Sequence, residues 1–291
     1  MGPLLFILYI NDIPNVTNLG KFYIFADDTA VMFKADTVNE LQNKVNMAMP
    51  EISKWFQVNR LSLNASKSNY QMFTRNKVEN MQVKLQTVSI ERKSSVRYLG
   101  MHVDENLKWH NHIAHVASKI SRNLGVIGRA KFFLSSRELQ LLYNALIYPY
   151  INYCAVIWGN NYDSNTKRII LLQKRAVRII GKKSYLHPTN ELFIEHRMLK
   201  FSEVVKEQSM LILLRFINDT LPHPISQLVR LHITTRTRQV YHFAVPRALT
   251  NYKLFAFSCS APRTWNNVMT SIFPNLEDVP RSKLSLKNIF E

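Results

Sequence analysis

The sequence predicts an α+β fold, with small antiparallel sheets in the first third of the chain and helices in the rest. Up to about residue 105, short runs of β-branched and aromatic residues alternate with turn residues, which is typical of short strands. Farther along, apolar residues recur every three to four positions, the period of amphipathic helices. We therefore expect a β-rich unit with one helix at 1–105, a helical region at 106–183, and a mainly helical extension at 184–291.

The composition is that of a globular protein with a polyanionic partner. Apolar residues make up 46% of the chain and glycine and proline are few, which excludes a disordered chain. The formal net charge of +18 favours nucleic acid or an anionic membrane surface as the partner. Cys154 and Cys259 fit neither a zinc spacing nor a disulfide framework, so we expect core thiols in a reducing, intracellular setting.

The first third contains a strand–turn–strand pattern with two carboxylates at its tip. The apolar runs 22–26 and 30–33 flank Asp27, Asp28 and Thr29. Adjacent aspartates on a stiff hairpin suit Mg²⁺, which takes a few rigidly held carboxylates. Taken alone, the pattern leaves an ordinary β-turn as an equal alternative, because aspartate is common in turns.

Helix starts are marked by capping residues, whose side-chain oxygens accept hydrogen bonds from backbone N–H groups of the first turn. The chain has a Thr-x-x-Glu box at 37–40 and a Ser-x-x-Glu box at 135–138. Pro50 interrupts the first of these helices and should kink or restart it. Ser164 can cap a third helix over 165–182.

The helix expected at 165–182 places cations opposite an apolar seam. Such a face suits contact with a phosphate backbone, and a plain solvated face is the alternative. The seam consists of Ile169, Leu172, Ala176 and Ile179. The cationic side consists of Lys167, Lys174, Arg175, Arg178 and Lys182, together with Leu171. The cations that can extend it are Lys131, Arg137, Arg236, Arg238 and Arg247.

Two apolar stretches suggest a membrane segment, and one group of histidines suggests a metal site. From 139 to 162 there is no charged residue, but Pro149 and several amides favour a buried helix pair over a membrane span. The run 3–10 lacks the basic start of a signal peptide. His110, His112 and His115 have no cysteine or carboxylate at ligand spacing, so we expect a helix start and no zinc site.

Four blocks in the first third, in this order and spacing, resemble the reverse transcriptases of non-LTR retrotransposons (LINE elements), especially jockey-like ones. The blocks are 2–14, which resembles the end of polymerase motif B; 25–29, which resembles the metal-binding motif C; Trp55 with 59–64 and 67–68, which resembles motif D; and Tyr98-Leu99-Gly100, which resembles the strand near the primer grip. Weaker similarity to the same elements continues at 148–159 and 265–266.

The resemblance implies an RNA-directed DNA polymerase, which transfers nucleotides from deoxynucleoside triphosphates with two Mg²⁺ ions, an RNA template and a DNA primer. Asp27 would be a metal ligand and Asp28 its neighbour at the catalytic centre, whereas Asp12 matches no catalytic position. Asn64 and Lys67 would lie near the incoming triphosphate. From the residues alone, Lys67 is a solvated lysine and Asn64 a turn residue. Tyr98 and Leu99 can also serve as strand core.

By the same resemblance, 1–105 is an incomplete palm and 106–183 is a thumb-like region, while 184–291 has no assigned role. The family carries a further metal-binding aspartate in motif A, which precedes motif B and has no match in this sequence. We therefore expect this chain to be inactive by itself as a polymerase. Loss of that metal ligand should remove on the order of several kcal/mol of transition-state stabilisation. The alternatives are a non-catalytic, basic nucleic-acid-binding remnant and a degenerate reading frame without function.

Overall fold

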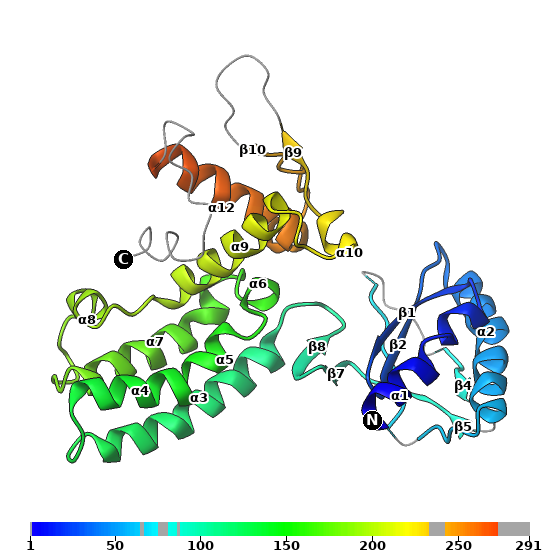
Figure 1. Ribbon diagram of the computed structural model, residues 1–291, viewed down its shortest axis with the longest axis horizontal. Helices are drawn as coiled ribbons and strands as arrows, with labels where there is room; N and C mark the ends of the chain where they lie inside the picture. The colour runs from blue at the N-terminus through cyan, green and yellow to red at the C-terminus, as the bar shows by residue number, and fades with distance from the viewer. Residues whose placement is uncertain (1, 65–66, 75–80, 86–87, 233–241, 273–291) are drawn as a thin grey trace. The chain divides into compact units, whose positions relative to one another are not determined.

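The computed structural model describes residues 2–64, 67–74, 81–85, 88–232 and 242–272 (Figure 1). The chain divides into two units, Met1–Asn106 and Leu107–Glu291. The first contains short strands and two longer helices, and the second is mainly helical. The predicted α+β class is therefore confirmed.

The first unit is built around one long helix and one β-hairpin. Helix α2 (Val38–Val58) packs against strand β2 (Asp28–Phe33), which pairs with β1 (Gly20–Phe25). Helix α1 (Gly2–Ile10) and the short 3-10 helix η1 (Ile13–Val16) complete this layer. Their shared core consists of Ile10, Ile13, Ala48, Ile52 and Phe56.

The start of α2 follows the sequence prediction, and its middle does not. The Thr37 side chain accepts a hydrogen bond from the Glu40 backbone N–H, so the predicted cap is confirmed. The helix runs through Pro50 without a restart, so the predicted restart is wrong, whereas the alternative of a kink stays a prediction. We attribute this continuity to packing, because Ala48 and Ile52 on either side of the proline are buried in the core.

The remaining strands of the first unit are short and are joined by side chains. Strand β3 (Asn69–Tyr70) pairs in parallel with β6 (Glu91–Arg92), and two antiparallel pairs complete the set. These pairs are β4 (Lys84–Leu85) with β5 (Val88–Ser89), and β7 (Ser95–Tyr98) with β8 (Met101–Asp104).

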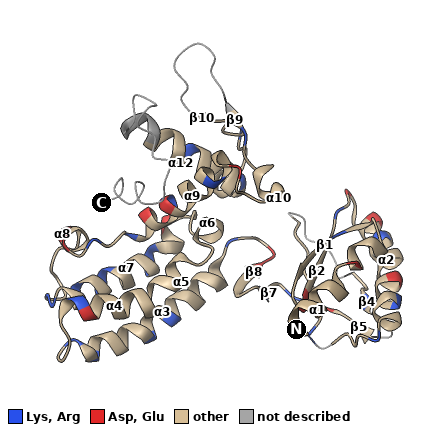
Figure 2. Ribbon diagram, viewed as in Figure 1, with Lys and Arg blue, Asp and Glu red and all other residues tan. Residues whose placement is uncertain are grey.

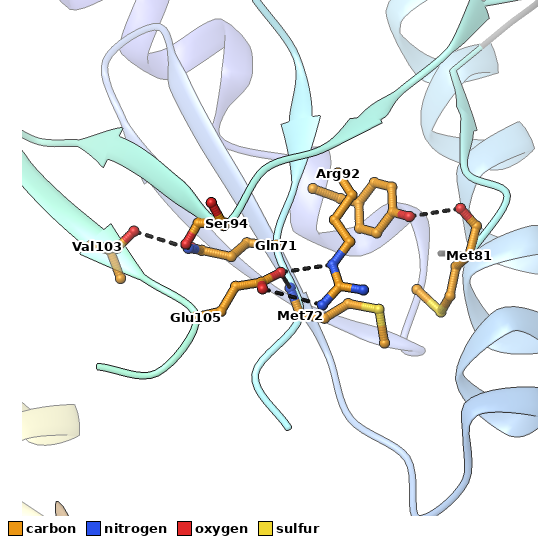
Figure 3. A network of polar contacts seen from close by, with 8 residues as sticks. Gln71, Met72, Met81, Arg92, Ser94, Val103 and Glu105 are labelled. Carbon is orange, nitrogen blue, oxygen red and sulfur yellow. Dashed lines mark hydrogen bonds and ion pairs between the residues drawn. The ribbon is translucent and has the colours of Figure 1, made fainter. Parts of the chain in front are cut away.

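A network of polar contacts connects the segment after β3 to the segments around β6 and β8 (Figure 3). The Arg92 guanidinium donates to both oxygens of Glu105, from Nε at 2.8 Å and from its terminal nitrogen at 3.2 Å. This guanidinium lowers the pKa of the Glu105 carboxyl. Gln71 Nε2 donates to the carbonyls of Ser94 at 3.1 Å and Val103 at 2.9 Å. Strands too short to hold a sheet by themselves are thus held in place by side chains.

The second unit is a helical bundle. Helices α3, α4 and α7 pack together, and α9 packs on α5, α6, α7 and α12 (Figure 1). The helices are α3 (His110–Ala130), α4 (Ser136–Leu146), α5 (Tyr148–Asn152), α6 (Ala155–Trp158), α7 (Asp163–Ile180), α8 (Asn190–Glu195), α9 (Phe201–Ile217), α10 (His223–Ser226), α11 (Asn251–Phe255) and α12 (Phe257–Ile272). Strands β9 (Leu231–His232) and β10 (His242–Phe243) form a small antiparallel pair.

Several helix boundaries in this unit test the sequence predictions. Ser135 and Glu138 form the predicted capping box at the start of α4. A helix break at Pro149 is also confirmed, because α4 ends at Leu146 and α5 carries the proline in its first turn. The predicted cap at Ser164 is wrong, since α7 already begins at Asp163. None of the helices that the structure describes is both long enough and apolar enough to cross a bilayer.

The bundle core contains a buried glutamine at the centre of α7. Gln173 is 1% exposed, and its Nε2 donates to the Tyr143 hydroxyl at 3.0 Å and the Leu199 carbonyl at 2.8 Å. Its Oε1 accepts from the Phe201 backbone N–H at 2.8 Å. One side chain therefore connects α7 to α4 and to the first turn of α9. It also satisfies a backbone donor that the start of a helix leaves unpaired.

Candidate active site

The two aspartates lie at the tip of the β1–β2 hairpin. The strands pair from Gly20 with Phe33 through to Phe25 with Asp28, so Ala26 and Asp27 form a two-residue turn. Ala26 has φ of 51°, in the left-handed region that L-residues rarely adopt. Asp27 therefore stands at the turn and Asp28 begins β2, with both side chains exposed. The predicted hairpin with its carboxylate tip is confirmed.

The hairpin is fixed to the unit through one face only. Phe22, Ile24, Val31 and Phe33 pack against the core cluster that α1, η1 and α2 build. Because side chains of a strand alternate between faces, the other face is turned away from that core. A carboxylate pair at the end of two anchored strands has little freedom to move, which is what a metal site requires.

The open face of the hairpin carries apolar and aromatic side chains beside Asp28. Tyr23 is 41% exposed, Phe25 is 64% exposed and Met32 is 57% exposed. Phe25 pairs directly with Asp28 across the ladder, so the two side chains share this face. Sequence reasoning did not single out Tyr23, and it included Phe25 only as the first residue of the block 25–29. Their spacing of two along a strand that ends at the aspartates was the available signal.

Tyr98, at the end of β7, interacts electrostatically with residues of this face. Burial raises the pKa of the Tyr98 hydroxyl, and the nearby Asp28 carboxylate and Tyr23 side chain raise it further. Leu99 and Gly100 form the turn between β7 and β8, with φ of 45° and 81°. The alternative assignment of Leu99 to a strand core is therefore wrong. Gly100 suits its position in this turn, because a positive φ costs glycine little.

Asn64 has the geometry of a turn residue. Its Oδ1 accepts a hydrogen bond from the Lys67 backbone N–H at 3.2 Å, and its carbonyl accepts from the Ser68 hydroxyl at 3.0 Å. The turn leaves the Lys67 side chain exposed to solvent. The interpretation of Asn64 as a turn residue is thus supported by its hydrogen bonds. A role of Asn64 or Lys67 in binding a triphosphate remains a prediction. Asp12, which matched no catalytic position, lies exposed at the start of η1.

Within the residues that the structure describes, no three histidine, cysteine or acidic side chains come together as a metal cluster. The aspartate pair at the hairpin tip is therefore a two-carboxylate donor set. At the start of α3, His112 is buried and its ring lies 5.1 Å from that of Trp158 in an edge-on contact. Packing accounts for this histidine.

The second candidate surface lies on α7, whose buried side differs in part from the predicted seam. The buried residues are Thr166, Ile169, Gln173, Ala176, Val177 and Ile180. Leu172 and Ile179 are only partly buried, because the centre of the buried stripe is rotated toward Gln173. A polar residue at that centre could not be identified from an apolar pattern.

The cationic side of α7 is present, but its members differ in exposure. Lys167, Arg175 and Lys182 are exposed, and Lys174 is partly buried. Arg178 has a structural role, since its Nε donates to the His187 carbonyl at 2.8 Å and its guanidinium lies 5.7 Å from the Tyr185 ring centroid.

Other cations lie on α7 or were predicted to extend its cationic side. Arg168 was missed in sequence and is exposed on the same side of α7. Arg137 is exposed in the first turn of α4, and Arg247 is exposed in the segment before α11. Arg236 and Arg238 fall outside the described residues. Figure 2 shows the positions of the described cations along the bundle.

Comparison with known proteins connects the hairpin to a family. The family described as "Reverse transcriptase (RNA-dependent DNA polymerase)" matches residues 1–103, which include the hairpin and the Tyr98 turn. No solved structure matches the chain.

Curated relatives extend the similarity into the second unit. The "Probable RNA-directed DNA polymerase from transposon X-element" of Drosophila melanogaster is 27% identical over 216 residues, which cover 71% of this chain and 23% of that protein. The "RNA-directed DNA polymerase from mobile element jockey" of the same fly is 22% identical and covers 66% of this chain and 22% of its own length. A type-1 retrotransposable element R1 polyprotein of Nasonia vitripennis is 23% identical, over 55% of this chain and 46% of its own length. The chain thus spans less than a quarter of the first two relatives. Residues 1–103 thus match the reverse transcriptase family, and the chain as a whole is similar to polymerases of non-LTR retrotransposons over about two thirds of its length.

Proposed function

We propose that the chain is part of an RNA-directed DNA polymerase, in which the β1–β2 hairpin presents Asp27 and Asp28 to the catalytic metal ions. The position of these carboxylates at a two-residue turn carries the proposal. The hairpin is anchored on one face by the core and open on the other, so the carboxylates are both held and accessible. A primer end and a nucleotide would approach from the open face.

The donor set fits magnesium. Mg²⁺ is commonly bound by one or two carboxylates, and water and substrate phosphates supply its other ligands. When bound, two such ions activate the primer 3′-oxygen and stabilise the leaving pyrophosphate. The contribution of the chain is to hold Asp27 as a ligand and Asp28 beside it on a backbone that does not need to reorganise.

The neighbouring residues have supporting roles in this proposal. Lys67 projects from the Asn64 turn as an exposed cation, suited to stabilise the triphosphate or to donate a proton to pyrophosphate. Tyr98, beside Asp28, would contact the primer strand together with the Leu99-Gly100 turn. In this scheme 1–105 is part of a palm that binds the RNA template and DNA primer, and 106–183 acts as a thumb.

We propose that residues 1–291 made as a separate polypeptide do not extend a primer. No segment of this sequence matches motif A, and no further acidic side chain joins the aspartate pair within the described residues. The test is primer extension on an RNA template with Mg²⁺ or Mn²⁺, using wild type and Asp27→Ala. Incorporation by wild type that Asp27→Ala abolishes would contradict the proposed inactivity.

A fusion tests the polymerase assignment itself. Residues 1–291 are joined behind the part of the X-element polymerase that precedes the matched region. We expect primer extension that Asp27→Ala reduces by roughly a thousandfold or more, because several kcal/mol of transition-state stabilisation depend on the metal ligands. The control Asp12→Ala, an exposed aspartate outside the site, should leave extension unchanged. An Asp27→Ala fusion as active as its parent would refute the assignment.

Nucleic-acid binding without catalysis is the second candidate, and the exposed cations of α7 favour it. This function needs only phosphate contacts, so it does not depend on a complete metal site.

A further inference from the structure

The most exposed apolar side chains of the helical unit gather at one end of its bundle. Among the large hydrophobic residues that the structure describes, four of the five most exposed lie in the α3–α4 and α7–α8 connections. They are Phe133 at 88%, Leu186 at 85%, Tyr185 at 77% and Phe132 at 76%. Side chains of this kind are normally buried, so this concentration calls for a partner.

The two connections lie at the same end of the bundle (Figure 1). Near the end of α3, a Cβ on Gly128 would lie 3.9 Å from Ile179 Cδ1 near the end of α7. At the start of α4, the Lys182 charge contributes to the lowered pKa of Glu138, after the larger effect of the Ser135 hydrogen bonds. We call the segments 129–138 and 178–187 together the bundle tip.

The exposed rings project from hydrogen-bonded turns. The backbone N–H groups of Phe133 and Leu134 both donate to the Ala130 carbonyl at 3.0 Å. In the other connection, Arg178 holds the His187 carbonyl and lies over the Tyr185 ring. The backbone that carries these rings is thus already ordered, so less ordering is needed when a flat partner stacks on them.

The charged residues around these rings are almost all cations. The bundle tip contains six cations and a single acidic residue, Glu138. The Glu138 carboxylate already accepts a hydrogen bond from the Ser135 backbone N–H at 2.7 Å. The cations are Arg129, Lys131, Arg137, Arg178, Lys182 and Lys183. Figure 2 shows blue segments at this end of the bundle.

We propose that the bundle tip binds single-stranded nucleic acid, with bases stacked on Phe132, Phe133 and Tyr185 and phosphates held by the surrounding cations. Unpaired bases offer flat faces to exposed rings, and cations beside the rings follow the backbone. A duplex keeps its bases stacked inside and offers these rings no equivalent surface. This site is distinct from the aspartate hairpin and does not rest on polymerase activity.

The test measures binding of residues 1–291 to a labelled, unstructured 20-nucleotide RNA and to a duplex of the same length. We expect the variant Phe133→Ala/Tyr185→Ala to bind the single strand at least about tenfold more weakly, since each stacked base contributes substantially to affinity. Its salt dependence should be unchanged, because the phosphate contacts remain. By contrast, Lys182→Gln/Lys183→Gln should flatten the salt slope by about 1.4.

Controls separate stacking from other causes. Leu249→Ala removes an apolar side chain that is 81% exposed outside the bundle tip and should leave affinity unchanged. Phe133→Trp should keep the affinity, and its fluorescence should be quenched when the RNA stacks on the indole. All these positions are exposed, so thermal melts of the variants should match wild type.

Three outcomes would overturn the proposal. One is single-strand affinity that does not change when both rings are removed. Another is equal, ring-dependent binding of the duplex. The third is ring-dependent binding to phosphatidylserine vesicles without binding of the RNA, which would identify the bundle tip as a membrane contact.

Discussion

Neutralising three exposed cations of α7 should weaken duplex binding through salt-dependent contacts alone. Lys167, Arg168 and Arg175 lie exposed on the side opposite the buried stripe, so glutamine at all three leaves the core untouched. Arg178 is left in place because its Nε holds the His187 carbonyl at 2.8 Å, and its loss would disturb the fold. The perturbation is therefore electrostatic.

The size of the effect follows from counterion release. If each cation neutralises one phosphate, the slope of log K against log salt should flatten by about 2.7 on duplex DNA. At a salt concentration of about 0.1 M, this corresponds to a loss of affinity of up to roughly 500-fold. The loss should be nearly equal for unrelated sequences, because phosphates carry no sequence information. The free energy of unfolding should change by less than about 0.5 kcal/mol.

The assay is fluorescence anisotropy of labelled primer–template duplexes across a salt series. A matched control carries glutamine at three exposed cations outside α7, Lys206, Arg215 and Lys253. It has the same net charge as the α7 variant and a different distribution. Equal slopes for the two variants would refute the reasoning, because overall charge rather than the α7 surface would then set the affinity.

Three further perturbations test other parts of the structure. Gln173→Leu should destabilise the fold by about 2–4 kcal/mol in denaturant melts, because it leaves buried backbone partners unsatisfied. Asp28→Asn should lower the pKa of Tyr98 in a spectroscopic titration, since it removes a negative charge that raises that pKa. The pKa of Glu105 is below its ordinary value because of Arg92, so this ion pair stabilises the fold at neutral pH and loses its contribution as pH falls through the lowered pKa. Melts from pH 6 to 3 should therefore show a smaller loss of stability for Glu105→Gln than for wild type.

Each of these has a contrary result. Gln227→Leu, at an exposed glutamine, serves as the neutral control for the buried one. A Gln173→Leu protein as stable as this control would mean that its partners find other hydrogen bonds. If the pKa of Tyr98 is unchanged in Asp28→Asn, then the Asp28 charge does not act on the Tyr98 hydroxyl. Acid melts that are parallel for Glu105→Gln and wild type would show that the ion pair does not govern acid stability.

Local chemistry made part of this structure predictable. The hairpin with Asp27 at its turn, the capping box at Ser135 and the helix break at Pro149 all depend on residues near one another in sequence. For the same reason the cationic side of α7 could be assigned from helical geometry. Such features are determined by residues that lie only a few positions apart in the sequence.

Other features depend on contacts between distant segments and could not be predicted. Gln173 is central to the core because Tyr143 and the start of α9 approach it, and neither neighbour is near it in sequence. Helical geometry alone assigned Arg178 to a phosphate-binding surface. Its structural role could not be predicted, because its partner, the His187 carbonyl, lies in a loop beyond the helix. Pro50 was expected to kink or restart its helix, and the buried face of that helix continues past the proline.

The left-handed turn at Ala26 sets the stability of the hairpin against the precision of the proposed metal site. An L-residue at φ of 51° costs on the order of 1 kcal/mol relative to glycine, so Ala26→Gly should raise the melting temperature slightly. Glycine would also admit many more backbone conformations at the residue before Asp27. If the proposed function is right, selection for thermostable variants would therefore tend to recover this substitution and to lower turnover with it. Screens at this position should score heat tolerance and catalytic rate separately.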